Sequence, residues 1–179
     1  MVPRVIGRSY AIEADLEIPE SGAEGVIVAN ADFIGGWGLW LDGDGRLNHS
    51  YSFLGVETYK QTSTEPIPSG TVTVKMLFES DETKPGSGGL VTLWAGDRRI
   101  GEGRIDKTIP IAPSSYAGMD IGRDNGLVVD LAYEDRAPYA FTGTVKRVVF
   151  DLRPATSHDD ERALHEHAAI HAVAHGVGA

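Results

Sequence analysis

Residues 37–53, WGLWLDGDGRLNHSYSF, decide the fold at the level of the sequence. A short apolar run at 37–41 is followed by the turn Asp42-Gly43-Asp44-Gly45, and its two glycines accept the positive φ that tight turns require. In the run that follows, Leu47 and Phe53 are packing residues. This stretch predicts a β-hairpin.

The sequence on both sides of this hairpin has the same character of strands and turns. From Tyr10 to Ile18 apolar and polar residues alternate with a period of two, which is typical of a strand with one wet face. Further strands are predicted at 25–29, 58–63, 71–79, 90–95, 99–105, 117–122 and 139–152. About ten such segments at a spacing of roughly 8 to 12 residues are typical of a sandwich or a barrel. We therefore predict an all-β fold, an antiparallel β-sandwich, over residues 1–153.

The pattern changes after Leu152. Residues 154–158 contain a proline and several turn formers, and residues 159–174 are rich in Ala, Glu and Leu. Acidic residues at the start of this stretch favour a helix N-terminus, and its apolar residues form a thin stripe along one helix face. We predict a helical or flexible C-terminal tail over 154–179 that needs a partner surface.

Composition narrows the possible partners. The chain has 179 residues, no cysteine, and 26 acidic against 16 basic residues, for a formal net charge of −10. This charge argues against nucleic acid as a partner, because few basic groups are present to neutralise phosphates. The lack of cysteine excludes disulfides, thiolate metal sites and a cysteine nucleophile.

No apolar run approaches the roughly 18 residues of a membrane span. We expect a cytoplasmic chain without a membrane anchor, and the short N-terminus before the first strand favours a fragment of a longer protein.

Several glycine-flanked segments occur in a characteristic order over residues 4–152. They are Gly35-Gly36, residues 51–55 (YSFLG), 65–70 (EPIPSG), 88–94 (GGLVTLW), 101–105 (GEGRI), 119–122 (MDIG) and 141–145 (FTGTV). Taken together, this order resembles the C-terminal domain of large bacterial arylsulfatases. The resemblance implies a jelly roll of the concanavalin or laminin-G type and a catalytic α/β domain upstream.

In that family a formylglycine, made from the Cys or Ser of a Cys/Ser-x-Pro-x-Arg motif, attacks the sulfate ester beside a divalent cation. This chain contains no such motif. The resemblance therefore implies no catalytic residue here. It implies an accessory domain that packs on the catalytic sulfatase domain or on another subunit and helps to shape the substrate entrance.

The aromatic residues offer an alternative function, that of a carbohydrate-binding, lectin-like jelly roll. Trp37, Trp40 and Tyr51 are the candidate ligand-binding residues, because a sugar ring can stack on an exposed aromatic face. The two tryptophans are three positions apart and so face opposite sides of a regular strand. One of them is expected to be exposed unless the other sheet or a partner covers it.

Two groups of residues are candidate metal ligands. His167, His171 and His175 recur every fourth residue, so on a helix neighbouring imidazoles can share a Zn²⁺ or Ni²⁺ ion. Asp120 and Asp124 lie at the predicted rim of the sandwich and supply the oxygen ligands that Ca²⁺ prefers. The alternative for the histidines is a solvated helix face. The acidic residues lack the full ligand count of a calcium loop.

A hydrolase without a recognisable motif is a third possibility. The chain has no Gly-x-Ser-x-Gly elbow, and five of its six histidines lie in the tail. His49 is the sixth, and a triad would require a serine and a carboxylate beside it.

Overall fold

The computed structural model describes residues 2–32, 34–111 and 118–153, and in them it confirms the predicted all-β sandwich. The predicted tail over 154–179 lies outside these residues. The elements are β1 (Tyr10–Ile18), β2 (Gly25–Asp32), β3 (Gly35–Leu41), β4 (Arg46–Phe53), β5 (Glu57–Pro66), β6 (Gly70–Ser80), β7 (Gly89–Ala95), β8 (Arg98–Ile105), β9 (Met119–Ile121), the 3-10 helix η1 (Leu131–Arg136) and β10 (Thr144–Leu152).

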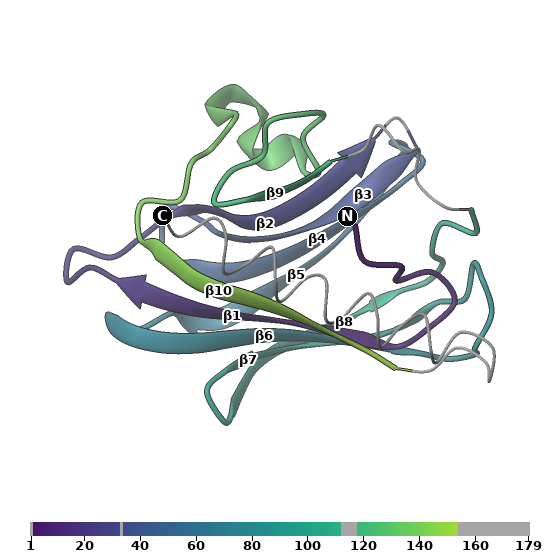
Figure 1. The fold of residues 1–179 in the computed structure, drawn as a ribbon, viewed down its shortest axis with the longest axis horizontal. Helices are drawn as coiled ribbons and strands as arrows, with labels where there is room; N and C mark the ends of the chain where they lie inside the picture. The colour runs from purple at the N-terminus through teal and green to yellow at the C-terminus, as the bar shows by residue number, and fades with distance from the viewer. Residues whose placement is uncertain (1, 33, 112–117, 154–179) are drawn as a thin grey trace.

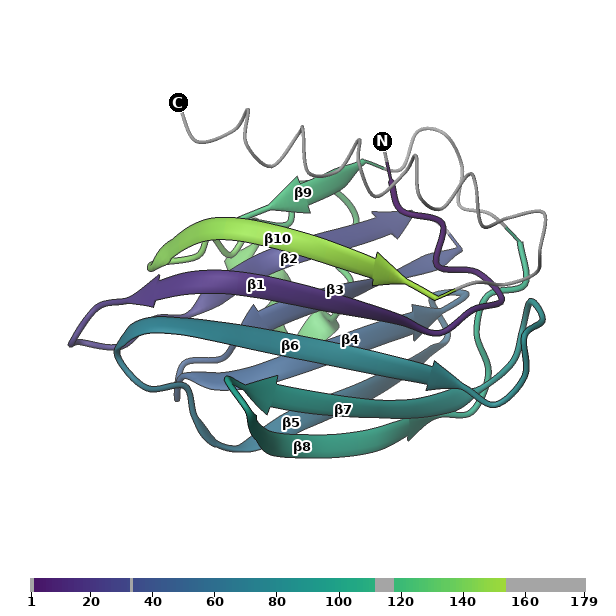
Figure 2. The ribbon, with the colours of Figure 1, turned by 60° about the horizontal axis from the view of Figure 1, so that its bottom comes forward.

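The strands form two stacked antiparallel sheets (Figure 1). Sheet A has the order β10-β1-β6-β7-β8, as Figure 2 shows from the side of that sheet. Sheet B has the order β5-β4-β3-β2-β9. Neighbours in the sheets are often distant in sequence, so the fold depends on long-range pairing.

The predicted hairpin is the centre of sheet B. β3 and β4 pair antiparallel, with Leu41 opposite Leu47 next to the turn. Asp42 fixes this turn, because its Oδ1 accepts hydrogen bonds from the amides of Asp44 and Arg46 at 3.0 and 2.9 Å. Gly45 has a φ of 74°, which glycine adopts without strain.

The alternation in residues 10–18 gives β1 one buried and one outer face in sheet A, as predicted. Ile12, Ala14 and Leu16 of β1 are fully buried between the sheets. Each fully buried Ile or Leu stabilises the fold by roughly 2 kcal/mol. The intervening acidic residues lie on the outer face, where Asp15 accepts hydrogen bonds from Thr73 and Arg147 at 2.7 and 2.9 Å.

The two sheets are joined along one side of the sandwich, where β5 runs beside β8. Gln61 of β5 donates to the carbonyl of Arg104 at 3.4 Å, and Thr64 donates to the carbonyl of Ile100 at 3.2 Å. Gly103 allows this approach, since a Cβ there would lie 2.8 Å from the Gln61 side chain.

The prediction of one strand over 139–152 was wrong at its start. β10 begins only at Thr144, and residues 122–143, here called the cover segment, fold over the outer face of sheet B (Figure 1). Tyr139 has a φ of 44° and is buried against Trp40, so the chain cannot run as a strand there. The cover segment also contains η1, which sequence reasoning missed. No helix in the described part of the chain is long and apolar enough to cross a membrane.

Candidate ligand-binding site

Trp37 and Trp40 lie on opposite faces of β3, as their spacing predicted. Trp37 points between the sheets, with its ring 5.5 Å from that of Phe150. Trp40 points to the outer face of sheet B, where the cover segment places the ring of Tyr133 at 5.0 Å. Each tryptophan is only 3% exposed, because the other sheet covers one and the cover segment covers the other.

Tyr51 is also buried, and its hydroxyl accepts a hydrogen bond from the Ile109 amide at 2.8 Å. Burial raises the pKa of this hydroxyl to about 12. None of the three rings predicted to contact a sugar therefore presents its face to solvent. The expectation of an exposed tryptophan on β3 is corrected, because residues 122–143 supply a cover that their sequence pattern does not reveal.

The two acidic residues predicted at the rim form hydrogen bonds in the cover segment, Asp124 from within the segment and Asp120 from β9. Asp124 is buried and accepts hydrogen bonds from the Tyr133 hydroxyl at 2.7 Å and the Val129 amide at 3.1 Å. Its burial raises the pKa of the carboxyl above the usual value, and these hydrogen bonds oppose the rise. Asp120 accepts from the amide of Asn125 at 2.9 Å.

The described residues contain no group of three or more His, Cys, Asp or Glu side chains placed to hold a metal ion. The calcium site at Asp120 and Asp124 stays a prediction. The predicted ligands His167, His171 and His175 lie outside the described residues.

His49 does not occupy a catalytic setting. It lies fully buried on the inner face of β4, where its Nδ1 is 2.9 Å from Oε1 of Gln61. Its Nε2 is buried and has no hydrogen-bond partner in the described part of the chain. Burial lowers the pKa of His49 to about 4, so the ring is neutral at pH 7. Its partner is an amide rather than the serine and carboxylate that a triad requires.

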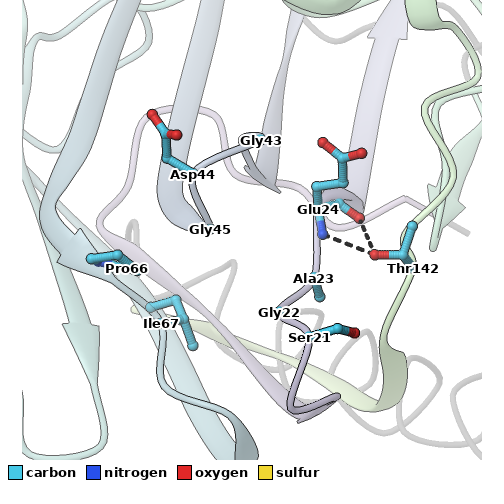
Figure 3. A pocket seen from close by; sticks show the side chains of 10 residues that line it. All are labelled: Ser21, Gly22, Ala23, Glu24, Gly43, Asp44, Gly45, Pro66, Ile67 and Thr142. Carbon is cyan, nitrogen blue, oxygen red and sulfur yellow. Dashed lines mark hydrogen bonds between the residues drawn. The ribbon is translucent and has the colours of Figure 1, made fainter.

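An open pocket lies at the end of the sandwich where the turns of both sheets meet (Figure 3). It has a volume of about 360 Å³, and we call it the end pocket. It is formed by residues 21–24 before β2, residues 43–45 of the β3–β4 turn, residues 66–67 at the end of β5, and Thr142 before β10. These segments are far apart in the sequence, which is why sequence reasoning did not identify the site.

One wall of the end pocket is built around Glu24. Its carboxylate accepts from Nη2 of Arg136 at 2.5 Å and from the Tyr139 hydroxyl at 3.1 Å. These interactions, led by the hydrogen bond from Arg136, lower the pKa of Glu24 below its usual value. The backbone is tied to Thr142, whose hydroxyl accepts from the Glu24 amide at 3.0 Å (Figure 3). Glu24 is therefore an ionised and positioned acceptor at neutral pH.

The opposite side of the end pocket has an exposed apolar residue, Pro66, beside the buried Ile67, and an exposed carboxylate. Pro66 and Ile67 lie across the pocket from Glu24 and Thr142 (Figure 3). Asp44 is exposed at the rim, and its carboxylate has no hydrogen-bond or ion-pair partner among the described residues. The end pocket thus combines a small apolar surface with two carboxylates.

We expect the Glu24–Arg136 pair to contribute little to stability. The two side chains are 31% and 49% exposed, and exposed ion pairs contribute about 0.2–1 kcal/mol because water screens them. A double-mutant cycle with Glu24→Gln and Arg136→Gln, measured by urea unfolding, should give a coupling energy in this range. A coupling energy above about 2 kcal/mol would show that the pair is shielded from water.

No family model matches the chain, and no curated protein matches it. Among solved structures it is similar to the CBM40 domain of the Ruminococcus gnavus IT-sialidase. Bound to α2,3-sialyllactose, that domain aligns with 14% identity and a TM-score of 0.51 over 88% of this chain and 82% of that chain. Bound to α2,6-sialyllactose, it aligns with 13% identity and a TM-score of 0.51 over 92% and 83%.

The native heptameric SAP-like pentraxin from Limulus polyphemus aligns with 12% identity and a TM-score of 0.48. That alignment covers 83% of this chain and 66% of the pentraxin chain, so this chain spans just under two thirds of the pentraxin's length. At such identities a likeness shows the fold alone. The likeness to the CBM40 domain agrees with the predicted jelly-roll type of β-sandwich.

Proposed function

We propose that this chain is a non-catalytic carbohydrate-binding module and that its binding site is the end pocket. The observation that carries the proposal is the composition of this pocket. Glu24 and Asp44 supply hydrogen-bond acceptors beside the apolar surface of Pro66 and Ile67. A sugar offers hydroxyl donors at its edge and C–H groups on its face, and small-molecule sites pair apolar contact with a few placed polar groups in this way.

The comparison with known structures supports the proposal at the level of the fold. The CBM40 domain, which shares the architecture, was solved with sialyllactose bound. A fold by itself does not define a ligand, so we infer the ligand class of this chain from the end pocket.

Saturable binding of an oligosaccharide, measured by glycan array and then by calorimetry, is the expected result. Ser21→Trp places a bulky ring at an exposed position of the end pocket and should weaken the binding at least about tenfold by steric exclusion. The matched control is Thr58→Trp, on the exposed outer face of β5 away from the pocket. The proposal fails if no saccharide binds, or if only Thr58→Trp removes binding.

The arylsulfatase parentage inferred from the order of segments stays a prediction. The coding sequence upstream in the same reading frame tests it directly, and a Cys/Ser-x-Pro-x-Arg motif there is the expected finding.

A further inference from the structure

The backbone of the end pocket has few free hydrogen-bond donors. Most of its amide N–H groups already donate to acceptors within the protein. The amides that do so are those of Gly22, Glu24, Asp44, Gly45, Ile67 and Thr142. Pro66 has no N–H group to offer. A ligand in the end pocket therefore meets mainly acceptors.

The charged groups around the end pocket also leave it with more hydrogen-bond acceptors than donors. Among the residues that the structure describes, no Lys, Arg or His lines it. Arg136, which lies beside it, is held by Glu24 and packs over the Tyr139 ring with its guanidinium carbon 4.3 Å from the centroid. The carboxylate of Asp42 is occupied by its own turn and by Nδ2 of Asn48 at 3.2 Å. The carboxylate of Asp44 has no such partner in the described part of the chain and is available to a ligand.

We infer that the end pocket selects saccharides that bring hydrogen-bond donors and no negative charge, with a free amino sugar preferred to its N-acetylated form. An ammonium group is purely a donor, whereas carboxylate and sulfate groups are purely acceptors. An acidic sugar would find no cation among the described residues that line the pocket. It would face the unpaired carboxylate of Asp44 on a chain of net charge −10, whereas Arg136 offsets the charge of Glu24. This inference rests on the proposed function. By this inference the chain differs in ligand charge from the CBM40 domain solved with sialyllactose, since sialic acid carries a carboxylate.

The test is calorimetric titration, at pH 6 and low salt, with a panel of glucose, galactose and mannose oligosaccharides, each in amino, N-acetyl and acidic form. We expect the amino form of the bound backbone to bind about fivefold more tightly than the N-acetyl form, which corresponds to one exposed ion pair. We expect no measurable binding of the acidic form. The preference for the amino form should shrink as salt is added, because salt screens exposed charges.

Asp44→Asn isolates the carboxylate on which this preference depends. The variant should bind the amino and N-acetyl forms equally. Glu79→Gln is the charge-matched control, because it removes one exposed carboxylate near the end of β6 that is remote from the pocket. It should leave the preference intact.

The outcomes separate this inference from the proposed function. If acidic forms bind as well as neutral ones, or if Asp44→Asn leaves the amino preference unchanged, the inference is wrong while carbohydrate binding stands. If equal binding of the amino and N-acetyl forms is found for wild type, the inference is likewise wrong. If no saccharide of any charge binds, both fail.

Discussion

Between pH 6.5 and pH 4 the free energy of unfolding should fall by about 3 kcal/mol less in His49→Leu than in the wild-type protein. His49 is fully buried, and its burial lowers its pKa from 6.5 to about 4. The unfolded chain therefore takes up a proton at this residue before the folded protein does. Acid shifts the equilibrium toward unfolding over that interval, whereas above pH 6.5 both states are neutral at His49 and the effect vanishes.

The measurement is the free energy of unfolding in urea at pH 7, 5.5 and 4 for wild type and His49→Leu. The other histidines and the carboxylates titrate in both proteins, so the difference between the two pH profiles reports on His49 alone. The variant also leaves the amide oxygen of Gln61 without its partner, which lowers stability by a constant amount at every pH. Parallel profiles would contradict the prediction.

Trp37→Ala should lower the free energy of unfolding by about 4 kcal/mol, because it removes a buried indole and leaves a cavity against Phe150. Trp40→Ala should have a similar effect, because the ring supports Tyr133 and Tyr139 of the cover segment. Urea unfolding at pH 7 measures both losses. The control is Trp94→Ala on the outer face of sheet A, where the ring is only half-buried and the loss should be clearly smaller.

A conservative substitution of Trp37 tests whether this residue acts in ligand binding as well as in stability. Trp37→Phe keeps most of the packing volume and lies in the core, away from the end pocket. We expect its affinity for a bound saccharide to equal that of wild type. A large loss of affinity in folded Trp37→Phe would indicate that the aromatic residues act in binding after all.

The fold class was predictable because short-range patterns carry it. The alternation in residues 10–18 and the turn at Asp42–Gly45 depend only on neighbouring residues, so they predict a strand and a turn wherever these lie in the fold. The opposite orientation of Trp37 and Trp40 was predictable for the same reason, since a strand has a period of two.

The sequence by itself determined the strands, the hairpin and the acidic character of the chain, because these follow from local periodicity, turn chemistry and composition. Only the tertiary structure decided which side chains are covered and where the end pocket lies. The cover segment has no regular period, so nothing local shows that Tyr133 and Tyr139 pack on Trp40. The end pocket brings Glu24 to Thr142 across 118 positions of the sequence, and the pairing of β1 with β10 creates that proximity.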